Sequence, residues 1–249
     1  MENKIHIIWH KSLDSTQNEV QRHLDDLDNL SVIAARDQTA GRGQRGNSWL
    51  TEPDRNLTAS LLIRFGTDGI PPLPAKTYFR LNMAFSLALQ AYLSSLCIPA
   101  VIKWPNDIYV KGKKICGVLI ENVLSEGKIA SSVIGFGLNL NQTDFPALAN
   151  ATSVKCLTGL ETDVDEALEI LSGLIVREIV DSLEGDGTGL LSRYEENLFG
   201  KGEKRNYRDL LHGEEFEGIL TGIAPDGRAV LHTGSGERLF AFKELGYIL

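Results

Sequence analysis

Four apolar, strand-like runs follow one another between residues 100 and 141 with no helical segment between them. They are AVIKW (100–104), IYV (108–110), ICGVLIENVL (115–124) and KIASSVIGFGLNLN (128–141). KGKK (111–114) places a glycine at the tip of a hairpin between the second and third runs. Because strands and helices do not alternate strictly, a doubly wound fold is disfavoured. The sequence predicts an α+β protein with a mixed β-sheet packed against helices.

The other segments of the first 200 residues supply more strands and helices. Strands are predicted at 4–10, 31–37 and 56–65, and helices at 15–27, 78–96, 163–185 and 188–199. Apolar residues recur every three or four positions in 78–96, which predicts a long, mostly buried helix. Ser15 or Thr16 is the expected N-cap of the first helix. Residues 66–76 are predicted to form a Gly/Pro loop.

The texture of the sequence changes after Gly200. The charged stretch KGEKRNYRD (201–209) is followed by short β segments separated by the turns APDG (224–227) and GSG (234–236). This pattern predicts a small β-barrel-like module. We therefore expect two domains, at 1–200 and 203–249.

Composition excludes several classes of protein. The 249 residues carry a net charge of −8, which argues against broad nucleic-acid binding. The 3 cysteines form no CxxC pair, and the N-terminus resembles no signal peptide, so a reduced, cytoplasmic setting is expected. No apolar run is long enough for a membrane span. His6 with His10 (HxxxH) and His212 with Glu215 (HxxE) have such spacings, but neither pair lies in a predicted helix, so no protein-ligated metal is predicted.

The stretch TAGRGQRGNSWL (39–50) lies between two predicted strands. Its glycines allow backbone N–H groups to approach an anion closely, and Arg42 and Arg45 add donors suited to phosphate or carboxylate. Trp49 would anchor the end of the loop. This loop either folds over a charged ligand or is a surface loop with solvated arginines.

Four more motifs are weak when each is taken singly. Lys103 in KWPND (103–107) ends an apolar strand, where its charge suits a carboxylate or an α-phosphate, or is simply exposed at a turn. Glycines interrupt apolar strands in GKKICGVLIE (112–121) and GFGLNLN (135–141), where a ligand must come close or packing alone explains them. The hydroxyls of DSTQ (14–17) cap a helix and could also donate to a neutral polar ligand.

Together, in this order and spacing, these motifs resemble the biotin–protein ligases, and the resemblance covers nearly the whole chain. It implies an α/β catalytic domain related to lipoate ligases, followed by a small SH3-like barrel. It also implies a two-step reaction, in which biotin and MgATP form biotinyl-5′-AMP and pyrophosphate. A lysine on the biotin carboxyl carrier domain of a biotin-dependent carboxylase then takes the biotinyl group and releases AMP.

The resemblance also implies roles for individual residues. Lys103 and Arg42 would be catalytic. The implied biotin contacts are Ser15, Thr16, Gln17, Gln38, Gly41, Arg42, Gly43, Gln44, Lys103, Gly117, Gly135 and Gly137. The implied ATP and adenylate contacts are Arg42, Gln44, Arg45, Trp49, Lys103, Asn106 and Asn139. Mg²⁺ would be carried mainly by the phosphates.

The chain departs from the family pattern at the loop. The commoner pattern is GRGRxGRxW, so Gln44 and Asn47 stand where arginines are more usual, and DSTN is DSTQ here. These changes bear on how tightly the intermediate is held. DSTQ begins at residue 14, and no DNA-binding domain is expected before it. Monomer and homodimer both stay open.

Two other functions compete with this reading. A lipoate or octanoate transferase would share the fold, but its RRxxGGGxVxHD motif does not occur here. A biotin-binding protein without turnover would fit the two missing arginines, although Lys103 is retained. A generic nucleotide-binding domain is disfavoured, because the chain has no P-loop.

Overall fold

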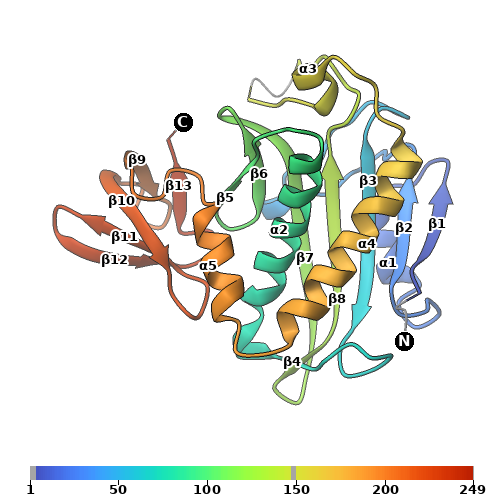
Figure 1. Cartoon of the computed structure of the whole chain (residues 1–249), viewed down its shortest axis with the longest axis horizontal. Helices are drawn as coiled ribbons and strands as arrows, with labels where there is room; N and C mark the ends of the chain where they lie inside the picture. The colour runs from blue at the N-terminus through green and yellow to red at the C-terminus, as the bar shows by residue number, and fades with distance from the viewer. Residues whose placement is uncertain (1–3, 147–149, 249) are drawn as a thin grey trace.

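The computed structural model describes residues 4–146 and 150–248, and for Arg45 it describes the backbone only. The larger part is an eight-stranded sheet with the strand order β1-β2-β3-β8-β7-β6-β5, in which β4 also pairs with β8 (Figure 1). The strands are β1 (His6–His10), β2 (Ser31–Ala35), β3 (Leu57–Arg64), β4 (Leu73–Pro74), β5 (Val101–Lys103), β6 (Asp107–Val110), β7 (Lys113–Ser125) and β8 (Lys128–Leu138). The β1–β2 pair is parallel and the other described pairs are antiparallel, so the predicted mixed sheet is confirmed.

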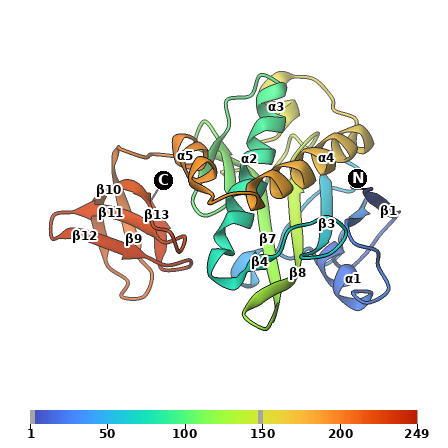
Figure 2. The ribbon, with the colours of Figure 1, turned by 60° about the horizontal axis from the view of Figure 1, so that its bottom comes forward.

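Helices cover the two faces of this sheet unequally. α2 (Phe79–Ser95) and α4 (Val164–Leu183) lie on one face, and α1 (Thr16–Arg22) lies on the other (Figure 2). Successive side chains of β2 point to opposite faces of the sheet. Val32 and Ala34 belong to the main hydrophobic core, whereas Ile33 belongs to a small cluster with Val20 of α1. α1 covers only part of its face, which leaves room beside it on the sheet.

Three helical details differ from the sequence prediction. α1 ends at Arg22 rather than near residue 27, since the Asp-rich segment that follows favours turns over helix. A short helix, α3 (Val154–Thr158), capped by Ser153, was not predicted. The predicted loop at 66–76 contains β4 and the start of η2 (Ala75–Thr77). The long buried helix at 78–96 and the Ser15 cap are confirmed, and α5 (Thr188–Glu196) follows α4.

The C-terminal segment forms a separate five-stranded antiparallel sheet, as expected. Its strands, in the order β12-β11-β10-β9-β13, are β9 (Lys204–Asp209), β10 (Glu215–Ile223), β11 (Ala229–Thr233), β12 (Gly236–Phe240) and β13 (Leu245–Tyr247). The pairings described run from β12 to β13 without joining these two ends, so no closed barrel is assigned. None of the helices in the described parts of the chain is long and apolar enough to cross a membrane.

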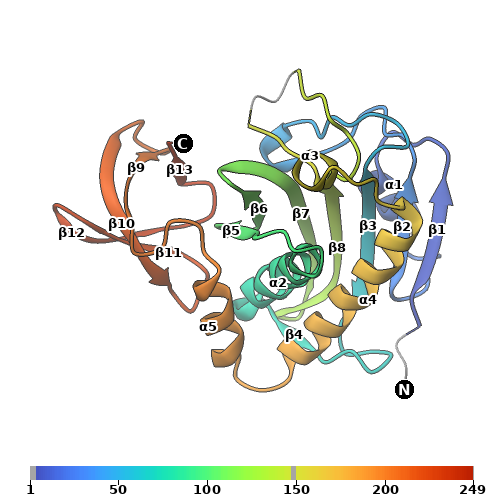
Figure 3. The same cartoon turned by 45° about the horizontal axis from the view of Figure 1, so that its top comes forward.

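The C-terminal sheet packs beside the β5–β6 edge of the large sheet and against α5 (Figure 3). The indole Nε1 of Trp104 donates to the carbonyl oxygen of Gly227 at 3.1 Å, and Glu195 Oε1 accepts from the backbone N–H of Ile223 at 2.7 Å. Buried residues of both sheets belong to one hydrophobic core. The two sheets are therefore held together by packing and by specific hydrogen bonds.

Candidate active site

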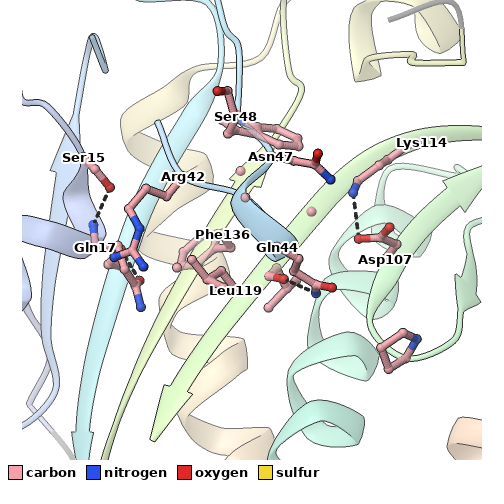
Figure 4. A pocket seen from close by; sticks show the side chains of 18 of the residues that line it. Ser15, Gln17, Arg42, Gln44, Asn47, Ser48, Asp107, Lys114, Leu119 and Phe136 are labelled. Atoms are coloured by element: carbon pink, nitrogen blue, oxygen red, sulfur yellow. Dashed lines mark hydrogen bonds and ion pairs between the residues drawn. The ribbon is translucent and has the colours of Figure 1, made fainter. Parts of the chain in front are cut away.

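A cavity of about 320 Å³ lies on the sheet face that α1 only partly covers (Figure 4). The start of α1, the loop after β2, the β5–β6 turn, β7 and β8 all contribute to its walls, and the segment from Phe242 to Tyr247 adds residues from the C-terminal sheet. Most of the residues predicted to bind ligands line it. They are Ser15, Thr16, Gln17, Gln38, Arg42, Gly43, Gln44, Trp49, Lys103, Gly117, Gly135 and Gly137.

One end of the cavity carries hydroxyl and amide groups. Ser15 caps α1, which fixes Thr16 at the first helical position. The backbone N–H of Thr16 donates to Gln38 Oε1 at 2.8 Å, and its hydroxyl lies 2.9 Å from that of Ser60. Because Thr16 occupies the oxygen of Gln38, a ligand meets mainly hydroxyls and the N–H₂ of this amide. These uncharged groups suit a neutral polar ligand group.

Gln17 lies against the strands rather than in open space. Its amide nitrogen donates to Glu121 Oε2 at 2.8 Å and to the carbonyl oxygen of Val133 at 3.1 Å. A Cβ atom at residue 135 would lie 2.5 Å from Gln17 Oε1, which is too close for any side chain other than glycine. Gly135 therefore leaves the space that the Gln17 side chain fills.

The other two strand glycines lie under the indole ring of Trp49. Gly117 and Gly137 are partners across β7 and β8. A Cβ atom would be 2.9 Å from the Trp49 ring at residue 117 and 2.2 Å from it at residue 137. The glycines of both apolar strands are thus explained by packing against the Trp49 and Gln17 side chains, one of the two readings left open by the sequence, and a ligand contact there stays a prediction. The Trp49 Nε1–H is buried and has no hydrogen-bond partner among the residues described.

The glycine-rich loop reaches the sheet through side-chain contacts. Arg42 pairs with Glu121 at 2.7 Å and donates to Asn18 Oδ1 at 2.9 Å. Gln44 donates to Asn106 Oδ1 at 2.9 Å and to the carbonyl oxygen of Val118 at 2.7 Å. The predicted contact of the Arg45 side chain lies outside the described part of the structure. The loop therefore closes one side of the cavity in the present arrangement.

The other end of the cavity is cationic. Lys103 ends β5 and donates to the hydroxyl of Tyr109 at 3.3 Å. Lys114 lies at the start of β7, forms a 2.8 Å ion pair with Asp107, and has its ammonium 5.9 Å from the centre of the Trp49 ring. Burial and the charge of Asp107 raise the pKa of Tyr109 to about 12, so its hydroxyl stays protonated beside Lys103.

Lys114 and Asp107 are site residues that the sequence reasoning missed, although both stand inside the motifs it singled out. The order and turn lengths of β5, β6 and β7 could have indicated both residues. The β6–β7 register places Lys114 opposite Tyr109, while the β5–β6 register places Lys103 opposite Asp107. Two lysines flanking one carboxylate could therefore have been inferred from the turn lengths. Phe242, Lys243 and Tyr247 also line the cavity, and nothing near them in the sequence indicates it.

Gly41, Asn106 and Asn139 do not line this cavity. Gly41 accepts from the backbone N–H of Trp49 at 2.8 Å and so closes the loop. Asn106 is buried and donates to Asn82 Oδ1 at 2.8 Å, and Asn139 donates to the carbonyl oxygen of Thr152 at 3.0 Å. Gly41 and Asn139 support neighbouring backbone, Asn106 bonds to the side chains of Asn82 and Gln44, and the ligand contacts expected of the three stay predictions.

Two chemistries find little support in the cavity. The described residues contain no group of three or more His, Cys, Asp or Glu side chains that could hold a metal ion. Cys116 lies within β7, and complete burial strongly raises the pKa of its thiol, so it is not a nucleophile. The arrangement instead suits binding and charge stabilisation of an anionic ligand, with Asp107 as a carboxylate within the lining.

Comparison with known proteins identifies relatives of the whole chain. The biotin/lipoate A/B protein ligase family matches residues 9–139. The bifunctional ligase/repressor BirA of Bacillus subtilis (strain 168) is 29% identical over 237 residues, which cover 93% of this chain and 70% of the relative. The biotin–[acetyl-CoA-carboxylase] ligase of Paracoccus denitrificans is 32% identical over 172 residues, which cover 66% of this chain and 69% of the relative.

A solved structure agrees with these matches. The biotin protein ligase from Aquifex aeolicus in complex with biotin and ATP superimposes with a TM-score of 0.80 at 27% sequence identity. The match covers 98% of this chain and 99% of the other, and so includes the C-terminal sheet as well as the large one.

Proposed function

Because the chain belongs to the biotin/lipoate A/B protein ligase family, we propose that it is an ATP-dependent ligase that attaches biotin to a lysine of a carrier domain. The resemblance to biotin–protein ligases drawn from the sequence is confirmed by the family match and by the relatives. In this proposal the partner is the biotin carboxyl carrier domain of a biotin-dependent carboxylase, and the setting is the cytoplasm.

One observation carries the proposal, which is that the cavity has two chemically different ends. Hydroxyl and amide groups at Thr16, Gln38 and Ser60 suit the ureido ring of biotin. Lys103 and Lys114 at the far end suit its carboxylate and the α-phosphate of ATP. Between the two ends lies the Trp49 ring, packed on Gly117 and Gly137, which offers an apolar wall to a flat, partly apolar molecule.

In the first step, an oxygen of the biotin carboxylate attacks the α-phosphorus of ATP. The bond to the β-phosphate breaks, and pyrophosphate leaves. Both reactants are anions, so positioned cations lower the barrier more than a base would. Lys114 is held by Asp107 at the edge of the floor, and Lys103 is held beside Tyr109. We assign to both lysines the stabilisation of charge on the α-phosphate of the adenylyl group that is transferred.

In the second step, the neutral amine of the carrier lysine attacks the carbonyl carbon of the mixed anhydride. AMP leaves with the bonding electron pair, and the proton of the amine passes to solvent. The intermediate is prone to hydrolysis, so excluding water matters. The loop from Gly41 to Trp49 closes one side of the cavity and provides that cover.

The residues fit a magnesium ion that is carried by phosphate oxygens. Asp107 would supply one carboxylate oxygen, and waters and phosphates would supply the rest, as is common for Mg²⁺. The ion would neutralise charge on the leaving pyrophosphate.

The decisive experiment is biotin transfer to a purified carrier domain, read as the mass of the carrier with and without ATP. An ATP-dependent gain of one biotinyl group is expected. Lys103→Ala, run beside the wild type, should abolish most of the gain. Biotin binding without any transfer would refute the ligase and favour a non-catalytic biotin-binding protein.

A lipoate or octanoate ligase is the nearest rival. The hydroxyl and amide end of the cavity argues against it, because an aliphatic tail would leave Thr16 and Gln38 without ligand partners. ATP–pyrophosphate exchange should therefore depend on biotin. Equal exchange with octanoate would overturn this specificity.

A further inference from the structure

The ammonium group of Lys103 lies between two tyrosine rings that come from different sheets. It is 4.9 Å from the ring centre of Tyr109 on β6 and 5.2 Å from the ring centre of Tyr247 on β13. Both distances are within the range in which a cation is attracted to an aromatic face. Lys103 thus has one ring from each of the two sheets beside its ammonium group.

Lys103 depends on such support because of where it sits. β5 has 3 residues and lies at the edge of the large sheet, where β6 is its only strand neighbour in the order described. A lysine side chain has many rotamers, and fixing its ammonium group needs contacts beyond its own backbone. Tyr109 supplies one contact from the neighbouring strand, and Tyr247 supplies the opposite one.

The Tyr247 ring is itself held in place by the C-terminal sheet. It packs edge-on against Tyr207 at 5.2 Å between ring centres, and it lies 6.2 Å from Phe199. β13 pairs with β9, which places Tyr247 opposite Tyr207. The position of this ring therefore follows from the packing of the C-terminal sheet against the large one.

The hydroxyl of Tyr247 has a second property. It is buried, lies in a residue that lines the cavity, and has no hydrogen-bond partner among the described residues. Burial raises the pKa of Tyr247 well above its usual value, so the group remains a donor. Buried hydroxyls normally find partners, so an oxygen of a bound ligand would complete it.

We propose that Tyr247 is a positioning residue of the ligase: its ring holds Lys103 at the phosphate end of the cavity, and its hydroxyl donates to a phosphate oxygen of ATP. This inference rests on the proposed function. It gives the C-terminal sheet a specific role, since one of the two rings near the Lys103 ammonium group comes from that sheet.

The test compares Tyr247→Leu, Tyr247→Phe and Tyr207→Phe with the wild type, using ATP–pyrophosphate exchange. The hydroxyls of Tyr207 and Tyr247 are both buried and have no hydrogen-bond partner among the described residues, but Tyr207 does not line the cavity, so Tyr207→Phe is a matched control. We expect kcat/KM for ATP to fall about tenfold in Tyr247→Phe and about 50-fold in Tyr247→Leu. Biotin affinity without ATP and the activity of Tyr207→Phe should stay unchanged.

A double variant separates positioning from general damage. If Tyr247 acts through Lys103, adding Tyr247→Leu to Lys103→Met should cost much less than it costs in the wild type. The Cε proton signals of Lys103, shifted by the two rings, should move toward ordinary lysine values in Tyr247→Leu even without substrates.

Three results would overturn the inference. One is an unchanged kcat/KM in Tyr247→Leu, and another is a loss in Tyr207→Phe equal to that in Tyr247→Phe. The third is a Lys103 signal that does not move. Should Tyr247→Leu fail to fold, the two phenylalanine variants still test the hydroxyl, and Tyr247→Met, which also lacks the ring, tests the contact with Lys103. A wild type that transfers no biotin would refute the proposed function. The Lys103 signal would still report whether the Tyr247 ring holds Lys103.

Discussion

Two walls of the cavity are built in different ways. The floor consists of β7 and β8, which pair continuously from Cys116–Leu138 to Val123–Ser131. The facing loop has few backbone contacts, such as Gly43 N–H to the Asn47 carbonyl oxygen at 2.7 Å, and otherwise depends on the side chains of Arg42, Gln44 and Trp49. The floor fixes geometry through its backbone, whereas the loop is held by contacts that a ligand can exchange.

This difference separates two kinds of residue. A change in the floor should alter the chemical step, because charge and shape there are rigid. A change in the loop should alter how long a ligand stays, because its contacts form and break. The following substitutions test this division, beginning with the largest expected effect.

Removal of the Lys114 charge should have the largest effect. Lys114→Met keeps the length of the side chain, and we expect the rate of adenylate formation to fall about 100- to 1000-fold, since a cation at the transferring phosphoryl group is lost. The measurement is single-turnover release of pyrophosphate. Lys113→Met is the matched control, because Lys113 is exposed and does not line the cavity. Equal losses in the two variants would contradict the assignment.

The second largest effect is expected when a side chain is added to the floor. In Gly137→Ala the new Cβ would lie 2.2 Å from the Trp49 ring, so the ring must move and the loop with it. We expect about a 100-fold loss of kcat/KM for transfer, because small displacements at a reacting centre are costly. Increased quenching of tryptophan fluorescence by acrylamide would report the exposed ring. Gly173→Ala, which meets no atom within 4 Å, should change neither quantity.

Gln44→Arg tests the expectation that a change in the loop alters how long a ligand stays bound. It places a cation where Gln44 now bonds to Asn106 and Val118, and where the family more often has arginine. We expect biotinyl-5′-AMP to dissociate about tenfold more slowly, with little change in the rate of its formation. Release of labelled intermediate measures this. A slower formation rate with unchanged release would contradict the division between the two walls.

The ion pair of Arg42 should give the smallest effect. The Arg42 and Glu121 side chains are 37% and 33% exposed, so their pairing contributes little to stability. Glu121→Gln keeps an acceptor for Gln17 but frees Arg42 for phosphate, and kcat/KM for ATP should rise about threefold at low salt. The gain should vanish at high salt. A loss of activity would show that Glu121 does more than hold Arg42.

Sequence reasoning worked where structure is local. The β6–β7 hairpin, the buried α2 and the Ser15 cap follow from turn residues, periodicity and capping. It failed where the signal was short. α3 has 5 residues, of which a single one is buried, and α1 ends at Arg22. Neither helix is therefore long enough to show a long apolar repeat in the sequence.

The candidate site divides in the same way. Motif order identified the loop, Lys103 and the strand glycines, because each lies within a contiguous stretch. Asn106 and Asn139 were chosen from their motifs, and in the structure their amide nitrogens donate to Asn82 and Thr152, so their ligand contacts stay predictions. Lys114 was overlooked because the hairpin register, not its own neighbours, brings it beside Asp107.

By itself, the sequence determined the strand-rich order of the large sheet, the glycines in its central strands and the family, since each depends on residue types at short spacings. Only the tertiary structure decided that Lys114 joins Lys103 at one end of the cavity and that Tyr247 covers Lys103 from the C-terminal sheet. The physical reason is that these contacts arise from strand register and from packing between sheets. Both depend on the whole chain, and no short stretch of it records them.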